Sequence, residues 1–507
     1  MIIDELQRKL ATWTASDPTR RVDRLLRLIA EHDWLTEAAR ITLSSSGAKT
    51  PGVDGVTKQH LGPDVLPDYL EHIRKELLSE EYTPAPARRI YILKANGKRR
   101  PLGIATLRDR IVQRAMLMAM QPIWENDFHN LSYGFRPERS VNHAIRTVKL
   151  QLTDNTDTRG RWVIEGDLAS YFDTVHHRLL MKSVRKRIRD NRFMSLLWKM
   201  VKAGHVDAGL FRAASEGVAQ GGVLSPLLSN IMLNEFDQYL EERYLSKKAR
   251  KDRWYNNYSV KVNRPSAKGL VRTWKPSVAY CRYADDFVIV VKGTKEQANQ
   301  IREECRCFLE NELKLTLNME KTHLTHVNDG FVFLGHRIVR KRSRFGDMRI
   351  YSMIPKEKAR NFRKSLAILL SGNHGDAGVD VVRKLNARLL GWSTFYRFVD
   401  NRAVVFSRID RTVFWKFAHW MARKYRCRIK SLLMRWVKSP EPKASKTWVL
   451  YDTVRGQHRR ADLQRLVGRS KSVFRWRGPS VNPYLRTDER KTITSRYADV
   501  AIAMSNA

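Results

Sequence analysis

The feature that most constrains this chain is a short apolar run interrupted by two adjacent carboxylates. Residues 281–291 read CRYADDFVIVV, so Asp285 and Asp286 break what otherwise has the composition of one buried strand. A surface turn is one interpretation, and a metal site is the other. Tight hairpins prefer Asn-Gly or Asp-Gly at the turn. Because two aspartates are poor turn residues, a chemical role explains them better than a turn does.

A second aspartate follows a strand-like run elsewhere in the chain. Residues 162–175 read WVIEGDLASYFDTV, where an apolar segment leads into Asp167 and then toward a helix. Taken alone, Asp167 would be a helix cap. Taken with Asp285, it matches the needs of nucleotidyl transfer, in which two Mg²⁺ ions contact the attacking and leaving oxygens. Such ions take hard oxygen ligands, and each usually binds one or two protein carboxylates.

The charge of the chain indicates the class of its partner. Its 507 residues contain 94 Lys and Arg against 52 Asp and Glu, a net charge of +42. An excess of this size favours binding to nucleic acid. No apolar run approaches the roughly 20 residues of a membrane span, so we expect no membrane association. The N-terminus resembles neither a signal nor a transit peptide, and four cysteines in so long a chain favour a reducing, cytoplasmic location.

The cysteines and histidines do not predict a zinc site. Cys305 and Cys307 precede His323 and His326, but the segment around the two cysteines has a helical pattern. Residues two apart on a helix point to nearly opposite faces, and zinc sites usually place two to four residues between their cysteines.

Two further motifs have the chemistry of a phosphate or nucleotide site. Residues 88–104 predict a hairpin, because Asn96-Gly97 is a strong tight-turn signal between extended runs. Lys94 and Arg100 flank that turn and could direct two cations at a triphosphate, although alone they would be ordinary solvent-facing residues. In EGVAQGGVLSPLLSNIML (216–233), the glycines allow close backbone approach to a ligand, and Gln220 is the residue we assign to that ligand.

Together these motifs resemble those of the reverse transcriptases encoded by group II introns, which also act as maturases. In that family YADD (283–286) is the catalytic turn, D-x-x-x-[FY]-F (167–172) is the first metal motif, and QGGVLSP (220–226) lies between them. The resemblance covers most of the chain in family order. Its other blocks are TPGVDG (50–55), IYILKANGKRRPLGI (90–104), RDRIVQRAM (108–116), SYGFRPERS (132–140) and FVFLGHRI (331–338).

The resemblance implies an α+β fold shaped like a right hand, with fingers, an antiparallel-sheet palm and a helical thumb. Residues 356–438 also have a helical pattern of their own, and 439–446 read as a linker. We therefore expect four regions: an N-terminal helical extension (1–45), fingers and palm (46–349), a helical thumb or maturase domain X (350–438), and a linker with a basic, possible DNA-binding region (439–507).

The resemblance also implies a role for each matching residue. Asp167, Asp285 and Asp286 are the expected catalytic carboxylates, and they bind two Mg²⁺ ions with the backbone carbonyl of Leu168. The expected nucleotide-binding residues are Lys94, Arg100, Phe172, Gln220 and Lys321, with Phe172 excluding a ribose 2′-hydroxyl and Lys321 protonating the pyrophosphate. The expected primer grip is Phe333, Leu334 and Gly335, and the expected RNA or template contacts are Gly134 and Arg136.

The implied activity is RNA-dependent DNA polymerisation, using dNTPs, an RNA template and a DNA primer. The implied partners are group II intron RNA, whose splicing and mobility the protein assists in a ribonucleoprotein, and target DNA. Many relatives end in an H-N-H endonuclease with paired cysteines, but no cysteine follows Cys427, so we expect no such domain.

Three other functions stay open at this point. They are a non-enzymatic RNA-binding splicing factor, a reverse transcriptase recruited to repair or phage defence, and an RNA-dependent RNA polymerase. The bulky ring at Phe172 disfavours an RNA-dependent RNA polymerase. The retention of all three aspartates disfavours a non-enzymatic splicing factor.

Overall fold

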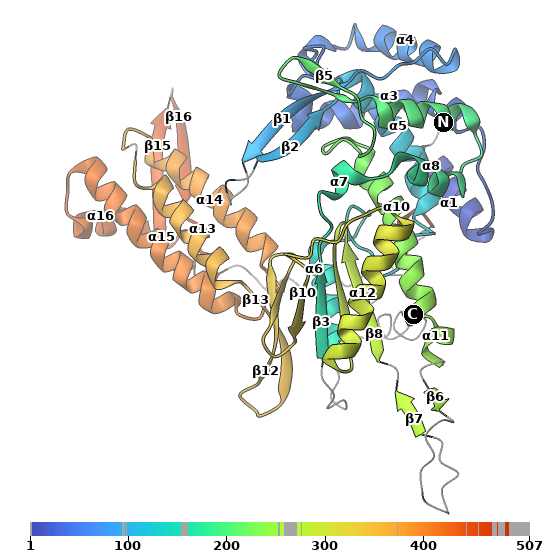
Figure 1. The fold of residues 1–507 in the computed structure, drawn as a ribbon. Coiled ribbons are helices and arrows are strands. Elements are labelled where there is room, and N and C mark those ends of the chain that lie inside the picture. Colours follow the sequence, from blue (N-terminus) through green and yellow to red (C-terminus); the bar gives the residue numbers. More distant parts are fainter. Residues whose placement is uncertain are drawn as a thin grey trace, which may run out of the picture. The chain divides into compact units, whose positions relative to one another are not determined.

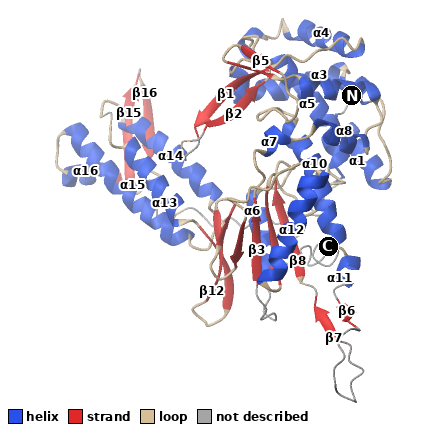
Figure 2. Ribbon diagram, viewed as in Figure 1, coloured by secondary structure: helices blue, strands red, loops and turns tan. Residues whose placement is uncertain are grey.

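The computed structural model describes residues 3–93, 97, 99–153, 161–251, 254–257, 271–274, 276–372, 374–442, 444–454, 456–468, 474 and 482–485. It divides into a larger unit, Met1–Gln151 with Thr156–His326 and Trp476–Ala507, and a smaller unit, Leu152–Asn155 with Val327–Arg475. Both contain helices and sheets, which agrees with the α+β class predicted from the sequence (Figure 2). The four regions expected from the sequence have boundaries that differ from those of these two units, and the four-region division stays a prediction.

Helices make up most of the larger unit (Figure 1). Before the motif at 167–172 lie α1 (Ile3–Ser16), α2 (Leu25–Ile29), α3 (His32–Ser44), η1 (Ser46–Lys49), η2 (Lys58–His60), α4 (Leu66–Leu78), α5 (Leu107–Trp124) and α6 (Val141–Leu152). After it lie α7 (Tyr171–Thr174), α8 (His177–Arg185), α9 (Asn191–Lys202), α10 (Ser225–Leu240), η3 (Glu241–Leu245), α11 (Lys247–Lys251), α12 (Lys295–Glu312) and η4 (Pro483–Leu485).

The central sheet of the larger unit has the strand order β10–β3–β9–β8, and each neighbouring pair is antiparallel. The strands are β3 (Arg161–Gly166), β8 (Ser277–Tyr283), β9 (Asp286–Lys292) and β10 (His323–His326). Both faces are covered. Cys281 contacts the Ala144 carbonyl of α6, whereas Phe287 packs against Phe236 of α10 on the other side. This explains why FVIVV is apolar at every position instead of alternating.

A second sheet has the order β2–β1–β4–β5. Its strands are β1 (Ala87–Leu93), β2 (Arg99–Ile104), β4 (His205–Asp207) and β5 (Leu210–Arg212). Strands β1 and β2 pair antiparallel from Arg88↔Ile104 to Leu93↔Arg99, which confirms the predicted hairpin. Residues 94–96 of its turn lie outside the described residues. A short pair, β6 (Trp254–Asn257) with β7 (Val271–Trp274), completes the described strands of this unit.

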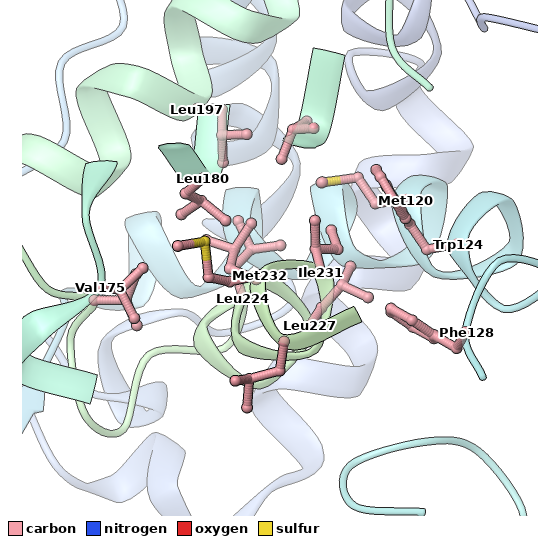
Figure 3. Packing of buried hydrophobic residues seen from close by; sticks show 14 of the residues in the cluster. Met120, Trp124, Phe128, Val175, Leu180, Leu197, Leu224, Leu227, Ile231 and Met232 are labelled. Atoms are coloured by element: carbon pink, nitrogen blue, oxygen red, sulfur yellow. The ribbon is translucent and has the colours of Figure 1, made fainter. Parts of the chain in front are cut away.

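Helix α10 lies at the centre of the larger core. Leu227, Ile231 and Met232 are almost fully buried, as is Leu180 of α8 (Figure 3). Trp124 and Phe128 close the same cluster from α5 and the segment after it (Figure 3). Because α10 is buried over most of its surface, including the polar side chains Asn230 and Asp237, it gives the neighbouring loops a rigid support.

The smaller unit has its own core. Helices α13 (Lys356–Leu369), α14 (Gly378–Phe395), α15 (Arg402–Tyr425) and α16 (Ile429–Trp436) confirm the helical pattern predicted over 356–438. Its strands are β11 (Phe331–Phe333), β12 (His336–Arg342), β13 (Met348–Met353), β14 (Val437–Lys438), β15 (Thr447–Val454) and β16 (Gln457–Asp462).

The segment predicted to be a linker connects two paired strands of this smaller unit. Val437 pairs with Trp448 across 439–446, so strands β14 and β15 belong to one sheet. Trp448 is fully buried and contacts Phe414 and Phe417 of α15. Its ring is therefore part of the core of the smaller unit.

No helix among the described residues is long and apolar enough to cross a membrane.

Candidate active site

Two strand ends bring the predicted carboxylates together. Strands β3 and β9 pair as far as Gly166↔Phe287, so the next positions, Asp167 and Asp286, lie opposite each other at the same end of the sheet. A Cβ atom on Gly166 would lie 2.1 Å from the ring of Phe287. Glycine is therefore required immediately before Asp167, because the ring occupies the space of a side chain.

The turn between β8 and β9 differs in detail from the sequence prediction. Tyr283 pairs with Asp286, so the loop residues are Ala284 and Asp285, and Asp286 is already the first residue of β9. Ala284 has φ +57°, in the left-handed region where alanine is strained. The Ala284 carbonyl accepts a hydrogen bond of 3.0 Å from the Arg282 guanidinium, which helps to hold this conformation.

A buried polar network supports that turn. Arg282 and Asp237 are fully buried and form an ion pair. Asn230 joins the network by accepting a hydrogen bond of 2.9 Å from Arg282 and donating one of 2.8 Å to the Gly134 carbonyl. Sequence motifs did not identify Arg282, Asp237 or Asn230 as site residues. A signal was present for Arg282 alone, because it is a charged residue within the otherwise apolar run 278–284, where a charge normally has a partner.

Asp167 lies in a short antiparallel bridge. Its backbone carbonyl accepts from the Asn318 amide at 2.8 Å, and Leu168 pairs with Leu317. Its carboxylate accepts a hydrogen bond of 2.6 Å from the Lys321 ammonium and one of 3.3 Å from the Asn318 side chain. The structure thus brings Lys321 to Asp167, 154 residues away in the sequence. Asn318 is a further site residue that the sequence motifs did not include.

The other two carboxylates have raised pKa values. Burial at the sheet end is the main cause of the raised pKa of Asp285, and the charge of Asp167 adds to it, whereas Arg100 and Lys321 act in the opposite direction. Burial and then the charges of Asp285 and Asp167 raise the pKa of Asp286 to about 6. The three carboxylates are therefore close enough to repel one another, and a cation among them would relieve that repulsion.

The donor chemistry of this cluster fits Mg²⁺, which prefers carboxylate and carbonyl oxygens. Within the described parts of the chain, however, no three His, Cys, Asp or Glu side chains are arranged around one common metal position. Lys321 interacts with the Asp167 carboxylate at the place where a cation would be expected. The residue types at this site therefore fit Mg²⁺, and in this structure the Lys321 ammonium contacts the Asp167 carboxylate.

Phe172 and Gln220 line one cavity of about 500 Å³. Phe172 is held by its carbonyl, which accepts from the Val218 amide at 2.7 Å, and the Gln220 carbonyl accepts from the Gly103 amide at 2.8 Å. These bonds connect the first catalytic motif, the QGG loop and strand β2 around the same space. Arg89 also lines the cavity, with its guanidinium 2.6 Å from the His205 ring.

The remaining predicted residues have varied positions. Arg100 is exposed on β2, and Lys94 lies outside the described residues. Gly134 packs directly against the catalytic turn, since a Cβ there would lie 2.2 Å from the Ala284 nitrogen. Arg136 is buried, and its guanidinium donates to Glu125 and to the carbonyls of His129 and Ser132. This geometry gives Arg136 a structural role and leaves its side chain no free donor face for a template.

The residues predicted to grip the primer belong to the smaller unit. Phe333 is buried, Leu334 has φ +46°, and the Gly335 carbonyl accepts a hydrogen bond of 3.1 Å from the Tyr396 hydroxyl of that unit. The tight turn at 334–335 is therefore anchored on the end of α14.

Comparisons with known proteins match two regions of the chain to families. Residues 92–338 match the family model "Reverse transcriptase (RNA-dependent DNA polymerase)", and residues 359–452 match "Group II intron, maturase-specific domain". Protein YkfC of Escherichia coli (strain K12) is 72% identical over 370 residues, which are 73% of this chain and 97% of that protein.

Two longer relatives carry descriptive names. The group II intron-encoded protein LtrA of Lactococcus lactis subsp. cremoris is 32% identical over 351 residues, 63% of this chain and 57% of LtrA. Nuclear intron maturase 2, mitochondrial, of Arabidopsis thaliana is 23% identical over 402 residues, 64% of this chain and 53% of that protein. This chain thus spans little more than half the length of these two relatives. From the matched family models and these identities, the chain belongs to the group II intron-encoded reverse transcriptase and maturase family.

Proposed function

We propose that this protein is an active RNA-dependent DNA polymerase that binds group II intron RNA and assists its splicing and mobility. The observation that carries the polymerase proposal is the meeting of Asp167, Asp285 and Asp286 at one end of the central sheet. A protein that only bound RNA would have no use for three carboxylates that repel one another, since phosphates require the opposite charge.

In this proposal, Asp167, Asp285, Asp286 and the Leu168 carbonyl hold two Mg²⁺ ions. When bound, these ions stabilise charge on the attacking and leaving oxygens of the transferred nucleotide. The dNTP occupies the cavity beside Phe172 and Gln220, where the Phe172 ring excludes a ribose 2′-hydroxyl. Arg100 and Lys94 contact its phosphates. Lys321 is exposed and pairs with the Asp167 carboxylate, and in this proposal its ammonium donates a proton to the leaving pyrophosphate.

The larger unit then corresponds to fingers and palm, and the helical part of the smaller unit to the thumb or domain X. Support for intron RNA as a partner comes from the maturase-specific match over 359–452 and from the net charge of +42. The names of the relatives agree with this proposal. The turn at Phe333–Gly335 is the proposed primer grip.

The test is Asp285→Asn, measured by primer extension on an RNA template with Mg²⁺. We expect extension to be lost, because one metal ligand becomes neutral, while RNA affinity stays within about twofold because phosphate contacts elsewhere dominate it. Asp64→Asn, at an exposed aspartate remote from the sheet end in sequence, is the matched control and should be fully active.

A second measurement does not depend on activity. Mg²⁺ should raise the melting temperature of the wild-type protein, since ligand at about 100 times its Kd adds about 2.7 kcal/mol to the free energy of unfolding. The rise should be much smaller in Asp285→Asn. Robust synthesis by that variant, or an equal Mg²⁺ shift in both proteins, would contradict the metal assignment.

A further inference from the structure

Helix α8 has a strongly basic outer face opposite its core face. Leu180 and Val184 are buried, and Leu180 points into the cluster around α10 (Figure 3). The other side of the helix and its C-terminal cap present four exposed cations, Arg178, Lys182, Arg185 and Lys186. Residues spaced by three, four, seven or eight positions share a helix face, so these charges form one row.

This row borders a groove with an apolar floor. The groove, of about 570 Å³, is lined by the row of cations, by Arg21, and by Met181 and Trp198. Met181 is buried, whereas the Trp198 ring of α9 is partly exposed. His177 contacts that ring edge-on with a centroid distance of 6.1 Å, and the Lys202 ammonium lies 4.8 Å from its centroid. The ring is therefore held in place at the floor of a basic groove.

Most of these cations are not neutralised by the protein. Lys186 forms an ion pair with Glu235 at 2.6 Å, and Arg185 donates to the Asn191 side chain at 3.1 Å. Arg21, Arg178 and Lys182 have no ion-pair partner in the described part of the chain. Such cations are available to an external anion, and none of the catalytic residues described above lines this groove.

We propose that this groove binds a single-stranded segment of RNA, with phosphates on the cations and a base stacked on Trp198. Single-strand sites combine a cationic track with aromatic surfaces, and each stacked base contributes about 1–3 kcal/mol. An acidic protein segment would also meet the cations, but it has no need for a partly exposed indole between them. The choice of RNA as the ligand rests on the proposed function, and the groove would be a second RNA contact distinct from the polymerase site.

The first experiment measures binding of the full-length protein to a fluorescein-labelled, single-stranded RNA of mixed sequence at several salt concentrations. Arg178→Gln/Lys182→Gln should lower the slope of log K against log salt by about 1.4, because two phosphate contacts of about 0.7 each are lost. Lys49→Gln/Lys75→Gln, two exposed lysines outside the groove, should leave the slope unchanged. Trp198→Leu, which keeps an apolar side chain at the floor, should weaken binding about 5- to 150-fold through lost stacking.

The second experiment locates the contact in the wild-type protein, so it does not depend on the stability of any variant. Ultraviolet crosslinking to the same RNA should modify peptides within 178–202. Equal slopes for the groove and control variants, or crosslinks only elsewhere, would overturn the proposal. The proposal would also be overturned if the groove variants lost binding to a polyglutamate peptide but kept wild-type RNA binding. That result would identify a protein partner.

A primer-extension assay separates this proposal from the polymerase proposal. The groove variants should extend a preformed template–primer duplex at the wild-type maximal rate when RNA is saturating. If the wild-type protein fails to extend, the polymerase proposal fails, while the salt slopes and crosslinks still decide whether the groove binds RNA.

Discussion

Ala284 is the residue that best explains why two aspartates stand together in this chain. Its left-handed backbone makes the tight turn, so Asp285 completes the loop and Asp286 begins the next strand. The sequence predicted a chemical role for the pair, because two adjacent aspartates are poor turn residues. It could not predict that an alanine bears the strain, because that depends on Arg282 and Gly134, which are fixed only in the folded structure.

Phe172 provides a prediction about substrate choice. Replacing it with alanine removes a ring from the wall of the cavity, so a ribose 2′-hydroxyl should fit. We expect the preference for dNTPs over NTPs, measured as the ratio of kcat/KM values, to fall at least about tenfold, the lower range for discrimination by bulk in a pocket.

The matched control for this change is Phe211→Ala. Phe211 is an exposed phenylalanine on β5 that does not line the cavity, so its loss should leave the preference unchanged. An unchanged preference in Phe172→Ala as well would show that this ring is not the gate.

At the scale of elements, the sequence predicted the strands and the hairpin around the site well. The run FVIVV, the Asn-Gly signal and the helical pattern of 356–438 all correspond to observed elements. Local patterns succeed there because periodicity and turn chemistry are local properties. The contact at the start of α10 is less local, since the helix begins at Ser225, whose hydroxyl donates to the Ala219 carbonyl six residues earlier.

Long-range contacts were the part that the sequence could not provide. Lys321 could be assigned only by resemblance, and its ion pair with Asp167 depends on the bridge between 167–169 and 316–318. The burial of Arg136 depends on Glu125, eleven residues earlier, whose carboxylate accepts from its guanidinium. Arg136 was expected by resemblance to contact the template, whereas the folded structure uses its guanidinium internally.

The support of the catalytic hairpin by Gly134 can be tested directly. In Gly134→Ala the new Cβ would lie 2.2 Å from the Ala284 nitrogen and 2.8 Å from the Tyr283 carbonyl carbon, so the turn must shift. We expect the free energy of unfolding to fall by about 1–3 kcal/mol, as for other overpacked sites, and primer extension to fall at least about tenfold.

Gly62→Ala is the matched control, because a Cβ added at Gly62 would meet no atom within 4 Å. Urea denaturation and primer extension should show it close to wild type. Wild-type activity in Gly134→Ala would mean that the turn tolerates displacement, and the proposed need for a rigid carboxylate arrangement would be wrong.

At the scale of the whole molecule, the net charge of +42 and the acidic cluster serve different purposes. In the proposed function, cations spread over the chain give salt-dependent affinity for RNA, whereas Mg²⁺ relieves the repulsion that raises the pKa of Asp286. The proposed catalytic carboxylates and the proposed groove both lie in the larger unit, and the maturase-specific match lies in the smaller one. Binding and catalysis should therefore be separable by mutation.

The described end of the chain returns to the N-terminal helices within the larger unit. Tyr484 of η4 donates to the Gln121 side chain of α5 at 3.1 Å, and Asn482 donates to Asn126 at 2.6 Å. Asn126 in turn donates to the Ala11 carbonyl of α1 at 2.8 Å. Burial raises the pKa of Tyr484, consistent with a ring held against the protein. A basic tail that only bound nucleic acid would not need these contacts.

Tyr484→Ala should therefore destabilise the fold although it lies 363 residues from its partner Gln121. We expect the free energy of unfolding to fall by about 1–3 kcal/mol, somewhat less than for a fully buried aromatic residue. The matched control, Tyr451→Ala, removes an exposed tyrosine of the smaller unit. It should change the free energy of unfolding by less than about 0.5 kcal/mol. Hydrogen exchange would locate the effect, since only Tyr484→Ala should loosen α1 and α5. Equal stability and exchange in the two variants would show that this segment only rests on the surface, and the chain end would then be free to bind nucleic acid.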